Sequence, residues 1–183
     1  VELGLEVNSD KKVEWVCGCP YCGDEKHLYL SSQSLLYNCK KCNESGNYLH
    51  LTAQLTENLA EDIDKKILSQ LAKDRQLPVA AIKNYSIGHT GSYDTLPVRN
   101  FYGQINNVLR YRPSGKLLGA PGCKMGLFGA QHLSNNKRQK EPVYVVEGPW
   151  DALAFEWVRK KAKKPGVVTA VLGAGQLPVG FAN

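Results

Sequence analysis

The sequence lacks the long apolar run that a membrane-spanning helix needs. None of its hydrophobic stretches approaches the roughly 20 residues required to cross a bilayer, although 43% of the 183 residues are hydrophobic. The start, Val1-Glu2-Leu3-Gly4, also lacks the basic segment and following apolar segment of a secretory signal. We therefore expect an intracellular, globular chain without a membrane partner, large enough for one ordinary domain or two small ones.

One long stretch of the sequence lacks acidic residues. Between Asp94 and Glu141 there is no Asp or Glu, and this interval carries more positive charge than the whole chain, whose net charge is +6. Its cations are Arg99, Arg110, Arg112, Lys116, Lys124, Lys137, Arg138 and Lys140, and Phe101, Tyr102, Tyr111 and Phe128 are interleaved with them. Cations neutralise phosphates and rings stack on bases, so the pattern favours single-stranded nucleic acid or nucleotides. The alternative is a basic surface over a small core that needs those aromatic residues.

Four of the six cysteines form two pairs with the spacing of a zinc site. Cys19 and Cys22 form the first pair, Cys39 and Cys42 form the second, and each pair encloses two residues. In a reducing compartment such pairs bind metal more often than they form disulfides. Each pair fits a tight turn that directs two thiolates at one point. The spacing predicts a zinc ribbon with one structural Zn²⁺, and Gly23 and Gly46 are suited to its turns.

The segment between the cysteine pairs reads as two short strands. Residues 27–30 and 35–38 carry the apolar and aromatic side chains of strands, and the polar segment 31–34 forms the turn between them. Because the two pairs already complete a tetrahedral site, we expect Cys17 to be a strand residue and His27 to lie at the surface. Cys123, far from the pairs, is expected to be a small packing residue.

The residues around the cysteines resemble the amino-terminal zinc-binding domain of bacterial and phage replicative DNA primases. The resemblance rests on Cys19-Pro20-Tyr21-Cys22-Gly23-Asp24, the aromatic strands, and Cys39-Lys40-Lys41-Cys42 running through Gly46 into a helix. It implies that the domain contacts single-stranded template at the initiation sequence. The residues it proposes as readers of the template are His27, Tyr29, Ser32, Gln33 and Tyr37.

The middle of the chain combines helical periodicity with a basic pair of strands. Apolar residues recur at helical spacing over 47–55 and again over about 57–72, and Pro78 begins a short helix. Residues 96–100 and 105–112 read as strands separated by a turn. This order is similar to the basic subdomain that precedes the catalytic fold of the same primases. The resemblance makes Arg110, Arg112 and Lys124 candidates for phosphate contact, with Lys116 as a weaker one. Arg99 of the basic interval is a further candidate for nucleic-acid or nucleotide contact.

A strand that ends in a glutamate marks the last part of the chain. The β-branched run 143–146 leads into Glu147, Gly148 and a helix. Open α/β sheets place their chemistry at such strand ends, and a carboxylate after a buried strand is costly unless it binds a cation or transfers a proton. The alternative is that the dipole of the following helix favours a glutamate at this position. Spacing alone supports the chemical role and the dipole role of Glu147 equally.

The pattern strand-Glu-Gly-x-x-Asp-Ala, followed by a helix and a second apolar strand, resembles the first half of a TOPRIM domain. The resemblance implies that Glu147 takes part in acid-base or metal chemistry with Mg²⁺ or Mn²⁺. Asp151 is expected to be a structural partner near the start of the helix, with a secondary metal role as the alternative. No Asp-x-Asp motif follows Glu147. Because the chain begins without methionine and ends at Asn183 without a terminating feature, we expect a piece of a longer protein, inactive alone, whose remaining metal ligands lie beyond that residue.

Together these features predict an α+β and α/β chain in three parts. Residues 1–56 form the zinc ribbon, 57–77 a helical linker, and 78–183 the catalytic region, with a basic subdomain at about 78–140 and a partial TOPRIM fold at about 141–183. The resemblance implies a cytoplasmic primase that makes RNA primers from ribonucleoside triphosphates on single-stranded DNA, with a replicative helicase fused or separate. The alternatives are a non-enzymatic single-stranded DNA-binding or loading factor, and a zinc-ribbon TOPRIM topoisomerase or repair protein.

Overall fold

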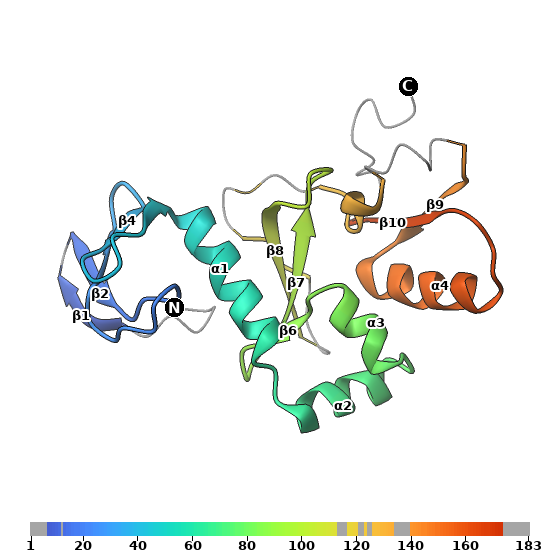
Figure 1. Ribbon diagram of the computed structural model, residues 1–183, viewed down its shortest axis with the longest axis horizontal. Helices are drawn as coiled ribbons and strands as arrows, with labels where there is room; N and C mark the ends of the chain where they lie inside the picture. Colours follow the sequence, from blue (N-terminus) through green and yellow to red (C-terminus); the bar gives the residue numbers. More distant parts are fainter. Residues whose placement is uncertain are drawn as a thin grey trace.

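The computed structural model describes residues 7–11, 13–112, 117–120, 123, 126–133 and 140–173. Its elements follow one another from the amino-terminal sheet at one end of the molecule to helix α4 (Pro149–Lys161) at the other (Figure 1). Among the described residues, no helix is both long and apolar enough to span a membrane. The fold is a mixture of antiparallel sheets, helices and one parallel strand pair, as the sequence predicts.

The first unit is a five-stranded antiparallel meander. Its strands pair in chain order: β1 (Val7–Lys11), β2 (Glu14–Cys17), β3 (Leu28–Ser31), β4 (Leu36–Cys39) and β5 (Ser45–Asn47). The two predicted strands correspond to β3 and β4 within one residue, and β2 ends at Cys17, which was expected to be a strand residue, whereas β1 and β5 were not predicted. A small core of Cys17, Leu28, Leu30, Tyr37 and Leu51 lies beside the cysteine pairs.

Helix α1 (Tyr48–Glu61) begins directly after this sheet. The Asn47 side chain accepts hydrogen bonds from the backbone N–H groups of Leu49 and His50, so the helix start is capped. The sequence predicted a break near residue 56, but α1 continues through it, with Thr56 buried and its hydroxyl bonded to the Thr52 carbonyl. The predicted domain boundary at 56 therefore falls inside a continuous helix.

The second unit has one core made from several elements. These are α2 (Lys65–Asp74), α3 (Val79–Asn84), the antiparallel strands β6 (Gly88–His89), β7 (Asp94–Arg99) and β8 (Ile105–Tyr111), the 3₁₀ turn η1 (Ala130–His132), and a final strand–helix–strand unit. Leu68 and Leu71 of α2 lie in the same core as Leu96, Leu109 and Leu153. Helix α2, placed in the predicted linker, is thus part of the second unit's core.

The last described elements are β9 (Val143–Glu147), α4 (Pro149–Lys161) and β10 (Val167–Val171). Strands β9 and β10 pair in parallel, with Val143 opposite Val167 and Glu147 opposite Val171. Phe128 forms an isolated antiparallel bridge with Ala170, which joins this pair to the rest of the core. The prediction of a buried β9 strand is wrong for its outward face: Val143 and Val145 are 43% and 40% exposed.

Candidate metal centre and nucleic-acid interface

The four paired cysteines converge on one point. The sulfur atoms of Cys19, Cys22, Cys39 and Cys42 all lie within 4.8 Å of one another, and no other metal-ligand cluster of this kind occurs in the described part of the chain. The Sγ atoms of Cys19 and Cys42 are 3.8 Å apart, and those of Cys22 and Cys39 are 3.9 Å apart. Tetrahedral zinc with Zn–S bonds of about 2.3 Å places its sulfur atoms about 3.8 Å apart. The cluster therefore fits a structural zinc ion.

Two similar backbone turns hold these sulfurs in place. In the first turn the Gly23 N–H donates to the Cys19 carbonyl at 2.9 Å, and in the second the Asn43 N–H donates to the Cys39 carbonyl at 2.9 Å. Gly23 has φ 72° and Asn43 has φ 63°, both in the left-handed region that Gly and Asn tolerate best. The prediction for Gly23 is confirmed. The prediction for Gly46 is wrong, because Gly46 lies in β5 and Asn43 takes the turn position.

The thiols differ in their electrostatic surroundings. Burial raises the pKa of Cys19 to about 12. Burial also acts to raise the pKa of Cys39, but the backbone N–H groups of Cys42 and Lys41 outweigh it and lower that pKa to about 7. Four thiolates at these separations repel one another strongly unless a cation lies between them. The cluster thus holds four ligand charges only with a metal present.

The remaining cysteines lie apart from the metal cluster. Cys17 ends strand β2 and is fully buried in the small core, as predicted. Cys123 contacts the Tyr48 hydroxyl, with 3.3 Å between Sγ and the oxygen, and it is partly exposed. Neither sulfur belongs to the four-cysteine set.

The predicted template readers separate into exposed and buried side chains. His27 is 52% exposed and pairs with Asp24, with 2.6 Å between Nδ1 and Oδ1. Tyr29 is partly exposed on β3, and Gln33 is exposed at the turn. Tyr37, in contrast, is only 4% exposed, stacks against Tyr21 and donates its hydroxyl hydrogen to the Tyr21 oxygen at 2.7 Å. Because a buried ring cannot stack on a base, the prediction for Tyr37 is corrected: it anchors the ribbon.

Helix α1 packs against both units through side chains along its length. Toward the zinc ribbon, the His50 carbonyl accepts from the Tyr21 hydroxyl at 3.2 Å, and Asn58 donates to the Pro20 carbonyl at 2.8 Å. Toward the second unit, Glu57 pairs with Arg99 of β7 at 2.7 Å. A Cβ added to Gly88 of β6 would come within 2.7 Å of the Leu59 backbone. One helix therefore connects the zinc ribbon to the β6–β8 sheet.

Arg99 is used in this connection. Its guanidinium donates to Glu57, to the Ser86 hydroxyl and to the Gly103 carbonyl, and its side chain is 18% exposed. These contacts leave little of the cation for phosphate. Arg99 is therefore set apart from the other predicted nucleic-acid residues.

Arg110 and Arg112 share one aromatic partner at the end of β8. The Cζ atom of Arg112 lies 4.0 Å from the centre of the Tyr93 ring, and that of Arg110 lies 5.9 Å from it. Alternation along β8 places both on the sheet face opposite Tyr111. Tyr93 was missed from the sequence because it precedes the basic interval. Lys116 and Lys124, the other predicted contacts, lie outside the described residues.

Glu147 lies at the carboxyl end of β9, as predicted, but it is exposed. The Gly148 N–H donates to the Val171 carbonyl at 3.1 Å, which fixes the strand end beside β10, and Gly148 has φ 107°. Asp151 lies in the first turn of α4, with Oδ2 3.3 Å from the position that a Cβ on Gly148 would take. The expectation of a costly buried carboxylate is wrong, because solvent reaches Glu147. Two accessible carboxylates still lie at one strand end.

Comparison with known proteins gives structural similarities only. No protein-family model matches the sequence, and no curated protein matches it. The solved structures that resemble it include an Aquifex aeolicus primase with zinc-binding and RNA polymerase domains, at 14% identity and a TM-score of 0.45. That match covers 92% of this chain and 61% of the other, so this chain spans about three-fifths of its length.

Two further structures belong to the same group. Primase domains in a bacteriophage T7 complex of lagging-strand DNA polymerase with an RNA/DNA hybrid and dTTP match at 19% identity and a TM-score of 0.45, covering 86% of this chain and 67% of that one. The DnaG catalytic core matches at 16% identity and a TM-score of 0.48, covering 66% and 54%. Since all TM-scores are below 0.5, these similarities by themselves assign no activity to this chain.

Proposed function

We propose that this chain is the template-binding and initiation part of a DNA primase, which synthesises short RNA primers on single-stranded DNA. The observation that carries the proposal is the shared helix α1, which packs against the zinc ribbon and against the sheet that carries Arg110 and Arg112. Two surfaces suited to nucleic acid are thereby held on one frame. A template strand that contacts the ribbon can then be directed along the basic sheet.

In this proposal each candidate residue has a distinct role. His27, Tyr29, Ser32 and Gln33 on the ribbon contact template bases at the initiation sequence. Arg110 and Arg112 neutralise backbone phosphates, and Tyr93 beside them offers a ring for stacking. Lys116 and Lys124, which lie outside the described residues, are proposed as further phosphate contacts from the sequence alone. The zinc ion holds the ribbon together and does not take part in the reaction.

The chemistry is assigned to the strand end of β9. Glu147, with Asp151 in a secondary role, would hold a divalent Mg²⁺ or Mn²⁺ ion together with ligands from the parent protein. Such an ion neutralises the charge that develops on transferring phosphates. Glu147 is exposed and thus accessible to a ribonucleoside triphosphate and the growing primer. A replicative helicase, fused or separate, is the proposed partner that supplies the unwound strand.

The test is ribonucleotide incorporation on single-stranded templates by the natural protein that contains this chain. A library of templates is required because the initiation sequence is not specified by the residues named here. Short RNA products that disappear in the Glu147→Gln variant, while single-stranded DNA affinity is unchanged, are the expected result. Template binding without any RNA product, with zinc and magnesium supplied, would instead assign the chain to non-enzymatic DNA binding.

A further inference from the structure

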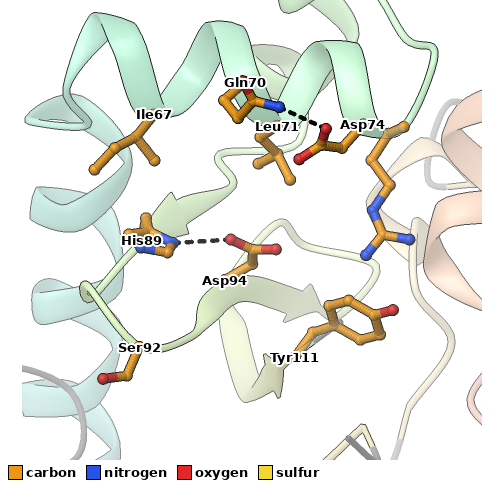
Figure 2. A pocket seen from close by; sticks show the side chains of 9 residues that line it. Ile67, Gln70, Leu71, Asp74, His89, Ser92, Asp94 and Tyr111 are labelled. Atoms are coloured by element: carbon orange, nitrogen blue, oxygen red, sulfur yellow. Dashed lines mark hydrogen bonds and ion pairs between the residues drawn. The ribbon is translucent and has the colours of Figure 1, made fainter. Parts of the chain in front are cut away.

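A cavity of about 530 Å³ lies between helix α2 and the strands β6, β7 and β8. Figure 2 shows Ile67, Gln70, Leu71 and Asp74 of α2 on one side and His89, Ser92, Asp94 and Tyr111 on the other. Its size is in the range of small-molecule sites, which are about 300–1,000 Å³. Because Tyr111 and Arg110 point to opposite faces of β8, this cavity is on the other side of the sheet from the Arg110–Arg112–Tyr93 cluster.

An aspartate with one unbonded oxygen lies in the cavity wall. The Asp94 side chain is 9% exposed, and its Oδ1 atom lies 2.9 Å from Nδ1 of His89. None of the described residues hydrogen-bonds to the second oxygen, Oδ2, which faces the open space between Asp74 and Tyr111 in Figure 2. A carboxylate this enclosed is costly unless its oxygens are bonded. The free oxygen is therefore an acceptor for N–H or O–H groups of a ligand.

A cation without an ion pair lies in the same wall. The Arg75 guanidinium stacks on Tyr111, with Cζ 4.5 Å from the ring centre, and on Trp150, at 4.2 Å. Tyr111 and Trp150 meet edge to face at 5.9 Å. No carboxylate of the described residues pairs with Arg75, since Asp74 accepts instead from Gln70 at 2.6 Å. Two rings thus hold a guanidinium in place while its N–H groups are free for an anion.

These contacts define a ligand with two different ends. One end is anionic and bonds to Arg75, and the other carries N–H or O–H donors for Asp94. Ile67 and Leu71 provide an apolar wall for a flat ring between them. A basic protein side chain satisfies Asp94 but is repelled by Arg75 and is too small for this volume. Inorganic phosphate satisfies Arg75 alone.

We propose that this cavity binds a free nucleoside monophosphate. The phosphate lies against Arg75, the ribose hydroxyls or the base amino group donate to Asp94, and the base packs on Ile67 and Leu71. The site is separate from the proposed template surface and does not depend on primer synthesis. Its Arg75 end touches Trp150, which follows Glu147 by three residues in the chain.

The test is titration of the zinc-loaded chain with each ribonucleoside 5′-monophosphate, followed by the NMR signals of the Ser92 amide and the Trp150 indole N–H. We expect saturable shifts of both signals with at least one nucleotide. Arg75→Gln should weaken that binding about tenfold. Lys73→Gln removes the same charge two residues earlier, in the last turn of α2, but Lys73 does not line the cavity, so this variant should leave affinity within about twofold.

A second variant separates the two ends of the ligand and guards against misfolding at Arg75. Asp94→Asn preserves the side-chain shape, and it should weaken nucleotide binding without changing the response to inorganic phosphate. The proposal is overturned if inorganic phosphate alone reproduces the shifts at equal affinity, or if no nucleotide shifts them at about 10 mM. It is also overturned if an oligonucleotide or N-acetyl-arginine amide is the ligand that binds these residues most tightly.

Discussion

Replacing Cys39 by serine tests the metal centre and the role of helix α1 together. Structural zinc contributes about 10–16 kcal/mol to the folding of zinc-finger peptides. The three buried leucines of the small core, Leu28, Leu30 and Leu51, contribute about 1.5–3 kcal/mol each. Because the metal is the larger contribution, loss of one of its four ligands should release zinc and unfold the ribbon.

The unfolding should extend into the first half of α1. Leu51 is buried against the ribbon, and the His50 carbonyl accepts from the Tyr21 hydroxyl. In the second half, the Asn58 bond to the Pro20 carbonyl would be lost. The second half of α1 should remain more protected, since the Glu57–Arg99 pair and the Leu59 contact belong to the other unit. We therefore expect Cys39→Ser to lose hydrogen-exchange protection over β2 to β5 and progressively along α1, while α2 to β10 stay protected.

Zinc content and residue-level hydrogen exchange measure the two parts of this prediction. Cys17→Ser is the matched control, because Cys17 is a fully buried neighbour that does not belong to the metal set. It should lose some stability through its buried hydroxyl and still retain one zinc per chain. A full zinc equivalent in Cys39→Ser would refute the ligand assignment, and an abrupt loss of protection in β6–β8 would refute the graded role of α1.

Three further predictions address the helix contact, the basic surface and helix α4. Gly88→Ala should lower stability by about 1–3 kcal/mol because its Cβ meets the Leu59 backbone, whereas Gly18→Ala, whose nearest neighbour is 3.8 Å away, should lose less in thermal unfolding. The double variant Arg110→Ala, Arg112→Ala should weaken single-stranded DNA binding and reduce the slope of log affinity against log salt concentration by about 0.7 per lost phosphate contact. Replacing the exposed Lys66 by alanine should not change that slope. An unchanged slope in the double variant would contradict a role of the two arginines in DNA binding. Burial acts to raise the pKa of Glu156, but hydrogen bonds from Arg159 and Lys160 outweigh it and lower that pKa in the folded state. These bonds therefore stabilise the folded protein fully above the unfolded-state pKa of about 4.3, and their contribution is lost as pH falls through the lower pKa of the folded state. Exchange protection of α4 in the wild type should therefore approach that of Glu156→Gln at acidic pH and exceed it at neutral pH.

Local spacing was sufficient to predict the metal site and several elements. The two cysteine pairs specify their own turns, so all four sulfurs converge as expected, and the alternating pattern places β3 and β4 within one residue. Local spacing did not predict which residue occupies the second turn. Asn43 replaces Gly46 in the second turn, because a polar residue that tolerates left-handed φ directly follows the last cysteine.

Contacts distant in sequence account for what was missed. Nothing near Tyr37 in the chain indicates that Tyr21 covers its ring, and nothing near Arg99 indicates that Glu57 neutralises it across 42 residues. Tyr93 and the His89–Asp94 pair were missed because they lie just before the basic interval on which the nucleic-acid prediction rests. Charge counted along the chain finds a basic region, but only the tertiary contacts separate Arg99, which is bonded to Glu57, from the candidate phosphate contacts Arg110 and Arg112.

The two faces of the β6–β8 sheet have opposite chemistry, and the register explains why. Along β8, Arg110 points to one face while Leu109 and Tyr111 point to the other, where they meet the core, Asp94 and α2. The first face carries two arginines, whereas the second carries the carboxylates of Asp74 and Asp94 beside the single guanidinium of Arg75. The binding of template and the binding of a small ligand can therefore be altered by separate substitutions on one strand. Arg112→Ala should change DNA affinity without changing nucleotide binding at the cavity, and Asp94→Asn should do the reverse; equal effects of both variants on both ligands would show that the faces do not act independently.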